Sequence, residues 1–244
     1  DGTVQCWGAN DSGQLGDGTF DQRSAPVTAV GVSGATRVSA GLGHACALVT
    51  GGSLVCWGNN SVGQFGNGTT SVSALHVPTP AVTGASWVAA VQVSTCAVVG
   101  GGVKCWGQNS FGALGDGTTT QRLSPVDVVG VSGATQVYTR VYSACARLGD
   151  CTLRCWGSNF SGNLGDGTTT HRPVPVPVVG VAQAASVAVG SGNTCALNAY
   201  TSVDCWGNNA YGQVGNGTIC GNATTPQEVQ VEPGPAVGLT PSQL

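Results

Sequence analysis

Charge is the most obvious shortage in this sequence. Only 8% of the 244 residues are charged, methionine is absent, and the chain has one lysine, Lys104, and two glutamates. Soluble domains usually carry about a quarter of their residues as charges. Lysine, glutamate and methionine are also strong helix formers. Their scarcity leaves little material for surface helices, so the sequence predicts an all-β chain.

Clustered positive charge and long apolar runs are also missing. The net charge is −3, and the arginines are scattered along the chain. Nucleic-acid binders need a basic surface that neutralises phosphates, so we do not expect a nucleic-acid partner. No apolar run approaches the roughly 18 residues that a membrane-spanning helix requires. The sequence therefore predicts no membrane span.

Glycine, by contrast, is abundant, and it belongs to a repeat. A Cys-Trp-Gly triplet returns about every 50 residues, each time followed by a loop of the form Asn-x-x-Gly-x-Leu-Gly-Asp-Gly-Thr and a Pro-Val segment. The triplet begins at Cys6, Cys56, Cys105, Cys155 and Cys205. Four short strands in a repeat of about 40 to 50 residues are typical of a propeller blade. Residues 1–244 are predicted to form one β-propeller domain of about five blades.

The aromatic residue of each triplet is expected to fill the seam between neighbouring blades. These residues are Trp7, Trp57, Trp106, Trp156 and Trp206, together with Leu15, Phe65, Leu114, Leu164 and Val214. The two ends of the chain fall at nearly the same point of the repeat. The favoured interpretation is a closed ring in which residues 235–244 supply a degenerate strand. Part of a larger propeller is the alternative.

The repeated Trp-Gly-x-Asn-x-x-Gly-x-(Leu/Phe/Val)-Gly motif, with its Pro-Val segment and Cys-Ala-Leu strand, resembles the regulator of chromosome condensation repeat over essentially the whole chain. The resemblance implies a propeller, usually of seven blades. This chain departs from the pattern because it has five repeats and paired cysteines. In that respect it is similar to secreted bacterial members of the family, one of which is a β-lactamase inhibitor.

Most of the 11 cysteines form pairs at constant spacing around a turn. The predicted pairs are Cys46 with Cys56, Cys96 with Cys105, Cys145 with Cys155, and Cys195 with Cys205. Cysteines that face each other across a tight hairpin lie within disulfide reach. Zinc and free structural thiols remain alternatives, although zinc sites usually need Cys-x-x-Cys or histidine partners. Disulfides would place the protein in an oxidising compartment, either secreted, periplasmic or at the cell surface.

Three cysteines are left over. Cys6 has no partner strand in the sequence before it, whereas Cys151 lies in a hairpin turn and Cys220 in an insertion found in no other repeat. Because both are unique, we expect a Cys151–Cys220 link between adjacent blades. An odd number of cysteines leaves at least one thiol free or available to another chain.

Catalytic and metal-binding patterns are not evident. The three histidines fall at different repeat positions, and Glu228 and Glu232 both lie in the divergent C-terminal part. The aspartates of the Gly-Asp-Gly-Thr loops supply one carboxylate per blade, too few for calcium. We interpret them as caps of their own turns. The sequence therefore predicts no enzyme activity, metal or cofactor.

Function on a repeat scaffold is expected where the repeats differ. Two sets of loops vary, one after each Cys-Trp-Gly-x-Asn and one before each hairpin cysteine. The candidate partner-binding residues are Phe111, Phe160, Tyr211, Arg140, Tyr142, Gln92 and His44. His44 also suits a structural hydrogen bond at the end of its strand.

The resulting hypothesis is a non-enzymatic extracellular scaffold that binds proteins or has a structural role. A subunit of an extracellular filament or surface assembly is a second possibility, because unpaired strand edges invite strand addition. The family resemblance adds two further alternatives, a secreted enzyme inhibitor and a guanine-nucleotide exchange factor for Ran. Carbohydrate binding is a weaker alternative.

Overall fold

The computed structural model describes residues 1–199 and 202–230. Its regular structure is β apart from one short 3₁₀ segment, η1 (Ser110–Gly112). The strands form one two-stranded and four four-stranded sheets, and every paired strand is antiparallel to its neighbour. Each sheet is a blade, which confirms the predicted all-β propeller of about five blades.

The five blades follow one another along the chain. Blade 1 contains β1 (Gln5–Gly8) and β2 (Arg23–Thr28). Blade 2 contains β3 (Ala35–Ala40), β4 (His44–Val49), β5 (Ser53–Gly58) and β6 (Ser73–Pro78). Blade 3 contains β7 (Ala85–Val91), β8 (Ser94–Val99), β9 (Gly102–Gly107) and β10 (Arg122–Asp127). Blade 4 contains β11 (Ala134–Arg140), β12 (Ser143–Leu148), β13 (Leu153–Gly157) and β14 (Arg172–Pro177). Blade 5 contains β15 (Ala184–Val189), β16 (Asn193–Asn198), β17 (Val203–Gly207) and β18 (Ala223–Glu228).

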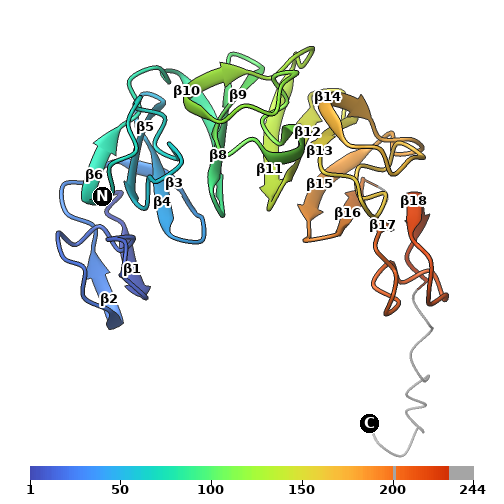
Figure 1. Cartoon of the computed structure of the whole chain (residues 1–244), viewed down its shortest axis with the longest axis horizontal. Coiled ribbons are helices and arrows are strands. Elements are labelled where there is room, and N and C mark those ends of the chain that lie inside the picture. The colour runs from blue at the N-terminus through green and yellow to red at the C-terminus, as the bar shows by residue number, and fades with distance from the viewer. Residues whose placement is uncertain (200–201, 231–244) are drawn as a thin grey trace, which may run out of the picture.

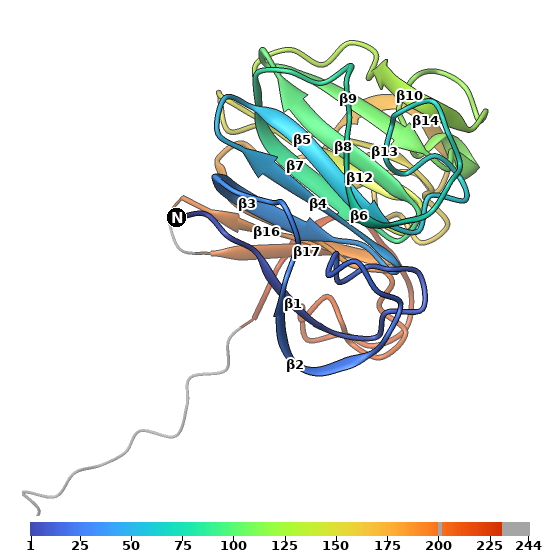
Figure 2. The same ribbon diagram turned by 90° about the vertical axis from the view of Figure 1, so that its left-hand side faces the viewer.

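The blades are arranged as an open arc, with blade 1 and blade 5 at its two ends (Figure 1). Each of the first four Cys-Trp-Gly repeats is shared between two blades. It supplies the outer two strands of one blade, such as β5 and β6, and the inner two strands of the next, such as β7 and β8. Figure 2 shows the blades stacked face against face along the arc. Residues 235–244, which we expected to close the ring, lie outside the described residues.

Four of the five repeat tryptophans lie in the seams between blades, as predicted. Trp57, Trp106, Trp156 and Trp206 are each 0% exposed. Each indole N–H donates to a backbone carbonyl in the loop of the preceding blade, as Trp106 does to Gln64 at 2.7 Å. Trp7 is a correction to this prediction, because it is 63% exposed. In the described chain no blade precedes blade 1, so its indole has no seam to enter.

The second strands of blades 2, 3 and 4 (β4, β8 and β12) begin with runs of buried residues rather than an alternating pattern. They are covered on both faces by neighbouring blades, which is why the sequence there is rich in alanine, valine and cysteine. The cysteines of these three strands and of β16 pair with those of the next strand in all four predicted hairpins, from Cys46–Cys56 to Cys195–Cys205, with Cα–Cα distances of 4.0–4.1 Å. The prediction of four hairpin disulfides is confirmed.

The expected Cys151–Cys220 link is wrong, because both thiols are free. Cys151 lies in the turn between β12 and β13, at one end of these strands, where its amide donates to Leu148. Cys220 lies at the opposite end of blade 5, where its amide donates to Asn209 in the loop after β17. Strands of about five residues span roughly 17 Å, which is far beyond the reach of a disulfide.

Candidate functional site

The two sets of variable loops lie on one face of the arc. One set consists of the loops after each Cys-Trp-Gly triplet, at residues 9–19, 59–69, 108–118, 158–168 and 208–218. The other consists of the turns between the first two strands of the complete blades, at residues 41–43, 92–93, 141–142 and 190–192. Backbone hydrogen bonds join the two sets, as from Asn59 to Gly43 at 2.7 Å and from Ser158 to Tyr142 at 2.8 Å. We call this surface the loop face.

In the four complete blades, the glycine of the triplet allows this close approach. Gly58 has a φ of +101°, and a Cβ on it would lie 2.4 Å from the carbonyl oxygen of Gly43. Gly157 has a φ of +97°, and its Cβ would lie 2.2 Å from the carbonyl oxygen of Tyr142. Only glycine avoids both the clash and the strain of positive φ. The invariant part of the repeat therefore brings the variable loops together.

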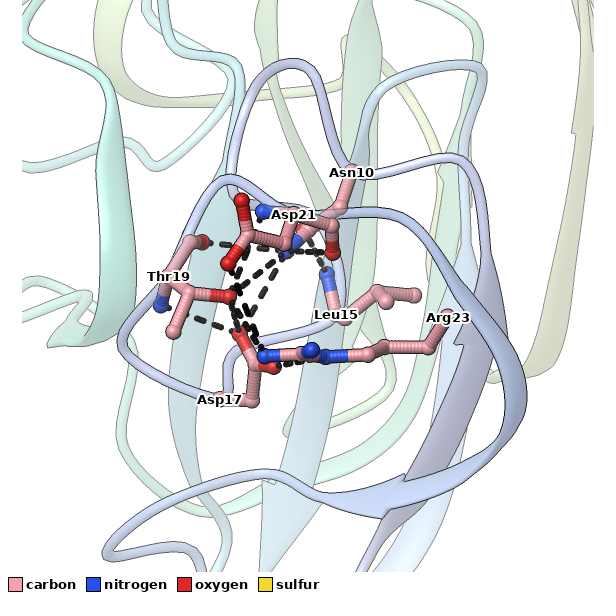
Figure 3. A network of polar contacts seen from close by, with 6 residues as sticks. All are labelled: Asn10, Leu15, Asp17, Thr19, Asp21 and Arg23. Carbon is pink, nitrogen blue, oxygen red and sulfur yellow. Dashed lines mark hydrogen bonds and ion pairs between the residues drawn. The ribbon is translucent and has the colours of Figure 1, made fainter.

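A repeated polar network fixes each long loop, and Figure 3 shows it in blade 1. The buried Asn10 side chain accepts from the Leu15 amide at 2.9 Å and donates to the carbonyls of Thr19 and Asp21, each at 3.0 Å. Asp17 accepts from the amide and hydroxyl of Thr19. This arrangement confirms that the aspartate caps its own turn.

The same aspartate also pairs with an arginine. Arg23 lies 3.0 Å from Asp17, whose side chain is 8% exposed. Burial acts to raise the pKa of Asp17, but the hydrogen bonds from Thr19 and the Arg23 guanidinium outweigh it and hold the pKa at about 2. Asp17 is therefore ionised at neutral pH and holds its own loop together.

Sequence reasoning missed this arginine, although the sequence contained the signal for it. Ion pairs of the same kind join Asp116 to Arg122 and Asp166 to Arg172. The partner always follows the aspartate by the same interval. In the two loops where asparagine replaces the aspartate, an uncharged residue replaces the arginine. Asn67 is followed at that position by Ser73, and Asn216 by Asn222. The joint change of both positions indicates that they interact.

An aromatic cluster on the loop face joins blades 3 and 4. We define the aromatic cluster as Phe111, Tyr142, Phe160 and His171. Phe111 comes from the loop after β9 in blade 3, and the other three come from blade 4. The ring of Phe111 lies 5.1 Å from that of Phe160 and 5.5 Å from that of Tyr142. These distances suit edge-to-face packing.

His171 is the polar member of the aromatic cluster. Its ring centroid lies 4.3 Å from that of Phe160 and 4.9 Å from that of Phe111. The Asn159 amide donates to its Nδ1 at 2.9 Å, so Nδ1 carries no proton. Phe160 remains 64% exposed despite these contacts. Contacts among the rings and the hydrogen bond from Asn159 thus hold the aromatic cluster in place, while the exposed part of Phe160 is accessible to a partner.

Three of the five non-glycine residues with positive φ in the described chain lie in the loops of the loop face, and the other two are Cys151 and Cys220. Phe111, Gln92 and Val141 have φ values of 59°, 33° and 45°, the region that favours glycine. Such strain costs roughly 1–3 kcal/mol for each residue and is often stored where loops bind ligands.

The other candidate binding residues are distributed differently. Tyr211 is 90% exposed in blade 5 but is not in the aromatic cluster. Gln92 lines a separate cleft of about 220 Å³ on the loop face, together with Leu42 and Val93. Arg140 ends β11 and is exposed. The sequence thus located a face, but only Phe111, Phe160 and Tyr142 come together on it.

His44 does not belong to the binding surface and is corrected to a structural residue. It is 1% exposed. Its Nε2 lies 3.0 Å from the hydroxyl of Thr95, which itself donates to the carbonyl of Gln64. The hydroxyl proton is therefore engaged, so Nε2 must donate. Burial lowers the pKa of His44 to about 4, and the neutral ring links blades 2 and 3.

Among residues 1–199 and 202–230, no three or more metal-ligating side chains are grouped to hold an ion. Within the same ranges, no helix is long and apolar enough to cross a membrane.

Comparison with known proteins identifies the repeat. A model of the regulator of chromosome condensation (RCC1) repeat matches residues 1–48 and 154–197, and a second model of the same description matches residues 35–64. No curated protein sequence matches the chain.

Solved structures with a similar fold include human WBSCR16, at 21% identity and a TM-score of 0.82, over 95% of this chain and 63% of that one. Prp20p from Saccharomyces cerevisiae, whose structure was described with its binding to Gsp1p and histones, has 20% identity and a TM-score of 0.78 over 94% of this chain and 59% of its own. The chain thus spans less than two thirds of these relatives. The repeat matches show that the chain contains repeats of the RCC1 type, and the solved structures show that it shares their propeller fold.

Proposed function

We propose that the chain is a non-enzymatic extracellular scaffold that binds a partner protein through its loop face, centred on the aromatic cluster. The observation that carries this proposal is the 64% exposure of Phe160 within a group of rings that the protein holds in a fixed arrangement. Exposed aromatic residues dominate the binding energy of many protein interfaces. Because these rings are already ordered, a partner would lose less entropy on binding.

Two further observations support the proposal. The four hairpin disulfides are typical of proteins that work in an oxidising compartment. A structural relative, yeast RCC1 (Prp20), has been solved bound to another protein, Kap60, with 19% identity to this chain. That likeness concerns the fold alone, so the partner of this chain is sought by its own surface chemistry.

The repeats themselves provide matched variants for a test. Phe111 stands where blades 1 and 4 carry Ser12 and Ser161, and Phe160 stands where other repeats carry Ser61 and Ser110. Phe111→Ser and Phe160→Ser therefore install residues that the same loop already accepts. Tyr211→Ala is the control, since it removes an exposed aromatic ring from the same face but outside the aromatic cluster.

The experiment captures partners from the extracellular fluid of the source organism on the immobilised protein, and then measures the affinity of the purified partner for each variant. We expect Phe160→Ser to weaken binding by about tenfold or more and Tyr211→Ala to leave it nearly unchanged. Intact mass without reduction checks that each variant keeps its disulfides. Equal affinity of the wild-type protein and both phenylalanine variants would reject the aromatic cluster as the binding site.

A further inference from the structure

The first strands of blades 2, 3, 4 and 5 lie on the inside of the arc (Figure 1). One position in these strands is constant, and its residues are Val38, Val88, Val137 and Val187. The position before it differs in every one of these blades, and its residues are Arg37, Trp87, Gln136 and Ser186. Function on a repeat scaffold is expected where the repeats differ, so this inner wall is a second candidate surface.

Three side chains of the inner wall form a row across three blades. The Arg37 guanidinium of blade 2 lies 3.2 Å from the centroid of the Trp87 ring, and its Nε donates to the carbonyl of Val88 at 3.3 Å. The Trp87 ring meets the ring of Tyr138 in blade 4 edge to face, with centroids 5.9 Å apart. Its indole N–H donates to the carbonyl of Val137 at 2.8 Å. The cation–π contact and these hydrogen bonds hold the row in place.

The row borders a cavity of about 270 Å³. The lining comes from the first strands of blades 2–5, each of which has all four of its strands in the described chain. It is mostly apolar and includes Val88, Val91, Val137, Ala188 and Val189. Small-ligand pockets are usually apolar with a few polar groups, and their volumes are roughly 300–1,000 Å³. A cavity of this size suits a ligand of few atoms.

Arg37 gives this cavity a positive charge that has no counter-ion. Three other arginines, Arg23, Arg122 and Arg172, each pair with an aspartate. In the described part of the chain no ion pair joins Arg37 to a carboxylate, and no aspartate or glutamate lines the cavity. Burial lowers the pKa of the Arg37 guanidinium, because a partly buried cation is poorly solvated. A bound anion would compensate for that loss of solvation.

Thr139 adds an unsatisfied hydrogen-bonding group to the same wall. It lines the cavity, and its hydroxyl oxygen is buried without a hydrogen-bond partner. The corresponding residue of blade 5 is Val189, which has no hydroxyl. Buried polar groups without a partner are rare because they cost free energy. A ligand oxygen beside this strand would provide one.

We propose that this cavity binds a small monocarboxylic acid, whose carboxylate pairs with Arg37 and whose apolar body contacts Tyr138 and the valines of the wall. Arginine binds carboxylates through two parallel hydrogen bonds. One guanidinium balances one negative charge, so a carboxylate fits better than a phosphate monoester with nearly two charges. No residue of the aromatic cluster lines the cavity, so the site is independent of the proposed protein-binding surface.

The test compares two probes of the same shape, phenylacetate and its uncharged amide, phenylacetamide. Isothermal titration calorimetry at low ionic strength measures the affinity of each for the whole protein. We expect phenylacetate to bind about tenfold or more tightly than the amide, because hydrogen bonds to charged groups are stronger than neutral ones. The tripeptide Gly-Gly-Phe carries the same groups at a peptide C-terminus. Tighter binding of the tripeptide would identify a protein C-terminus as the source of the carboxylate, and tighter binding of phenylacetate a free acid.

The repeats supply a matched variant for the arginine. Arg37→Gln installs the residue that blade 4 carries at the same position, Gln136. It should weaken phenylacetate binding about tenfold or more and leave binding of the amide unchanged. Arg154→Gln is the control, since it removes a positive charge from β13 outside the cavity lining, and it should change neither affinity. Urea unfolding checks that both variants are folded.

A second measurement locates the ligand in the wild-type protein. The indole N–H resonance of Trp87, assigned with Trp87→Phe, should shift on addition of phenylacetate more than the resonances of the buried Trp106 and Trp156. The proposal is overturned if neither phenylacetate nor the tripeptide binds, if phenylacetate and the amide bind equally, if Arg37→Gln keeps the wild-type affinity, or if the Trp87 resonance does not shift selectively.

Discussion

Blade 1 and blade 3 are built from the same repeat but have different surroundings. Trp106 in blade 3 is 0% exposed, whereas Trp7 in blade 1 is 63% exposed. Val88, on the inner strand of blade 3, is 1% exposed, whereas Val38, which faces blade 1, is 44% exposed. The comparison teaches that the motif supplies the residues of a seam, while burial depends on the preceding blade.

The largest expected effect contrasts these two tryptophans. Trp106→Ala should lower the free energy of unfolding by about 3–5 kcal/mol, because it empties a packed seam and removes the indole hydrogen bond to Gln64. Trp7→Ala should cost less than about 1 kcal/mol, since its ring is largely in water. Urea unfolding of both variants provides the measurement. Similar losses for the two would mean that blade 1 is covered in solution.

The cysteines allow the next contrast. Replacing Cys96 and Cys105 together by alanine should lower the free energy of unfolding by about 2–3 kcal/mol, the entropy expected for a loop of this length. Cys6→Ala should change it by less than about 0.5 kcal/mol, because its thiol is free. Denaturant unfolding under non-reducing conditions compares the two. A large loss for Cys6→Ala would contradict the difference between the blades.

The loop network should behave alike in blades 1 and 3, because each loop satisfies itself. Arg23→Ser and Arg122→Ser should each cost about 1–3 kcal/mol, since each leaves an aspartate with 6–8% exposure without its arginine. Adding Asp17→Asn or Asp116→Asn should recover part of the loss by recreating the uncharged pair of blade 2. Double-mutant cycles measure this coupling. A loss confined to blade 3 would show that the loop depends on a neighbouring blade.

The smallest effect is a pH dependence. The pKa of Asp17 falls from 3.8 to about 2 on folding, so the unfolded chain binds this proton more readily. The stabilisation is therefore complete above about pH 4 and is lost as the pH falls toward 2. Asp17→Asn should flatten the decline of unfolding free energy in this window. An unchanged slope would assign the acid sensitivity to other carboxylates.

Sequence reasoning recovered the repeat, the blades and the hairpin disulfides because these depend on residues that recur at fixed spacing. It failed for Trp7 and for the Cys151–Cys220 link, since both depend on how blades meet in space rather than on the repeat. It placed Phe111 and Phe160 among the binding candidates but did not predict that they meet. Their rings converge only because adjacent blades present different positions of the same loop.

The hairpin disulfides affect how the blades respond to proteolysis. Gly51 is exposed at the turn of the blade 2 hairpin, and exposed loop tips are preferred sites of proteolytic cleavage. The disulfide behind the turn joins the strands on both sides of that site. A cleaved turn would therefore release no fragment, and the cut strands would stay paired in the sheet. The hairpins described here tolerate a break in the main chain at the points where breaks are most frequent.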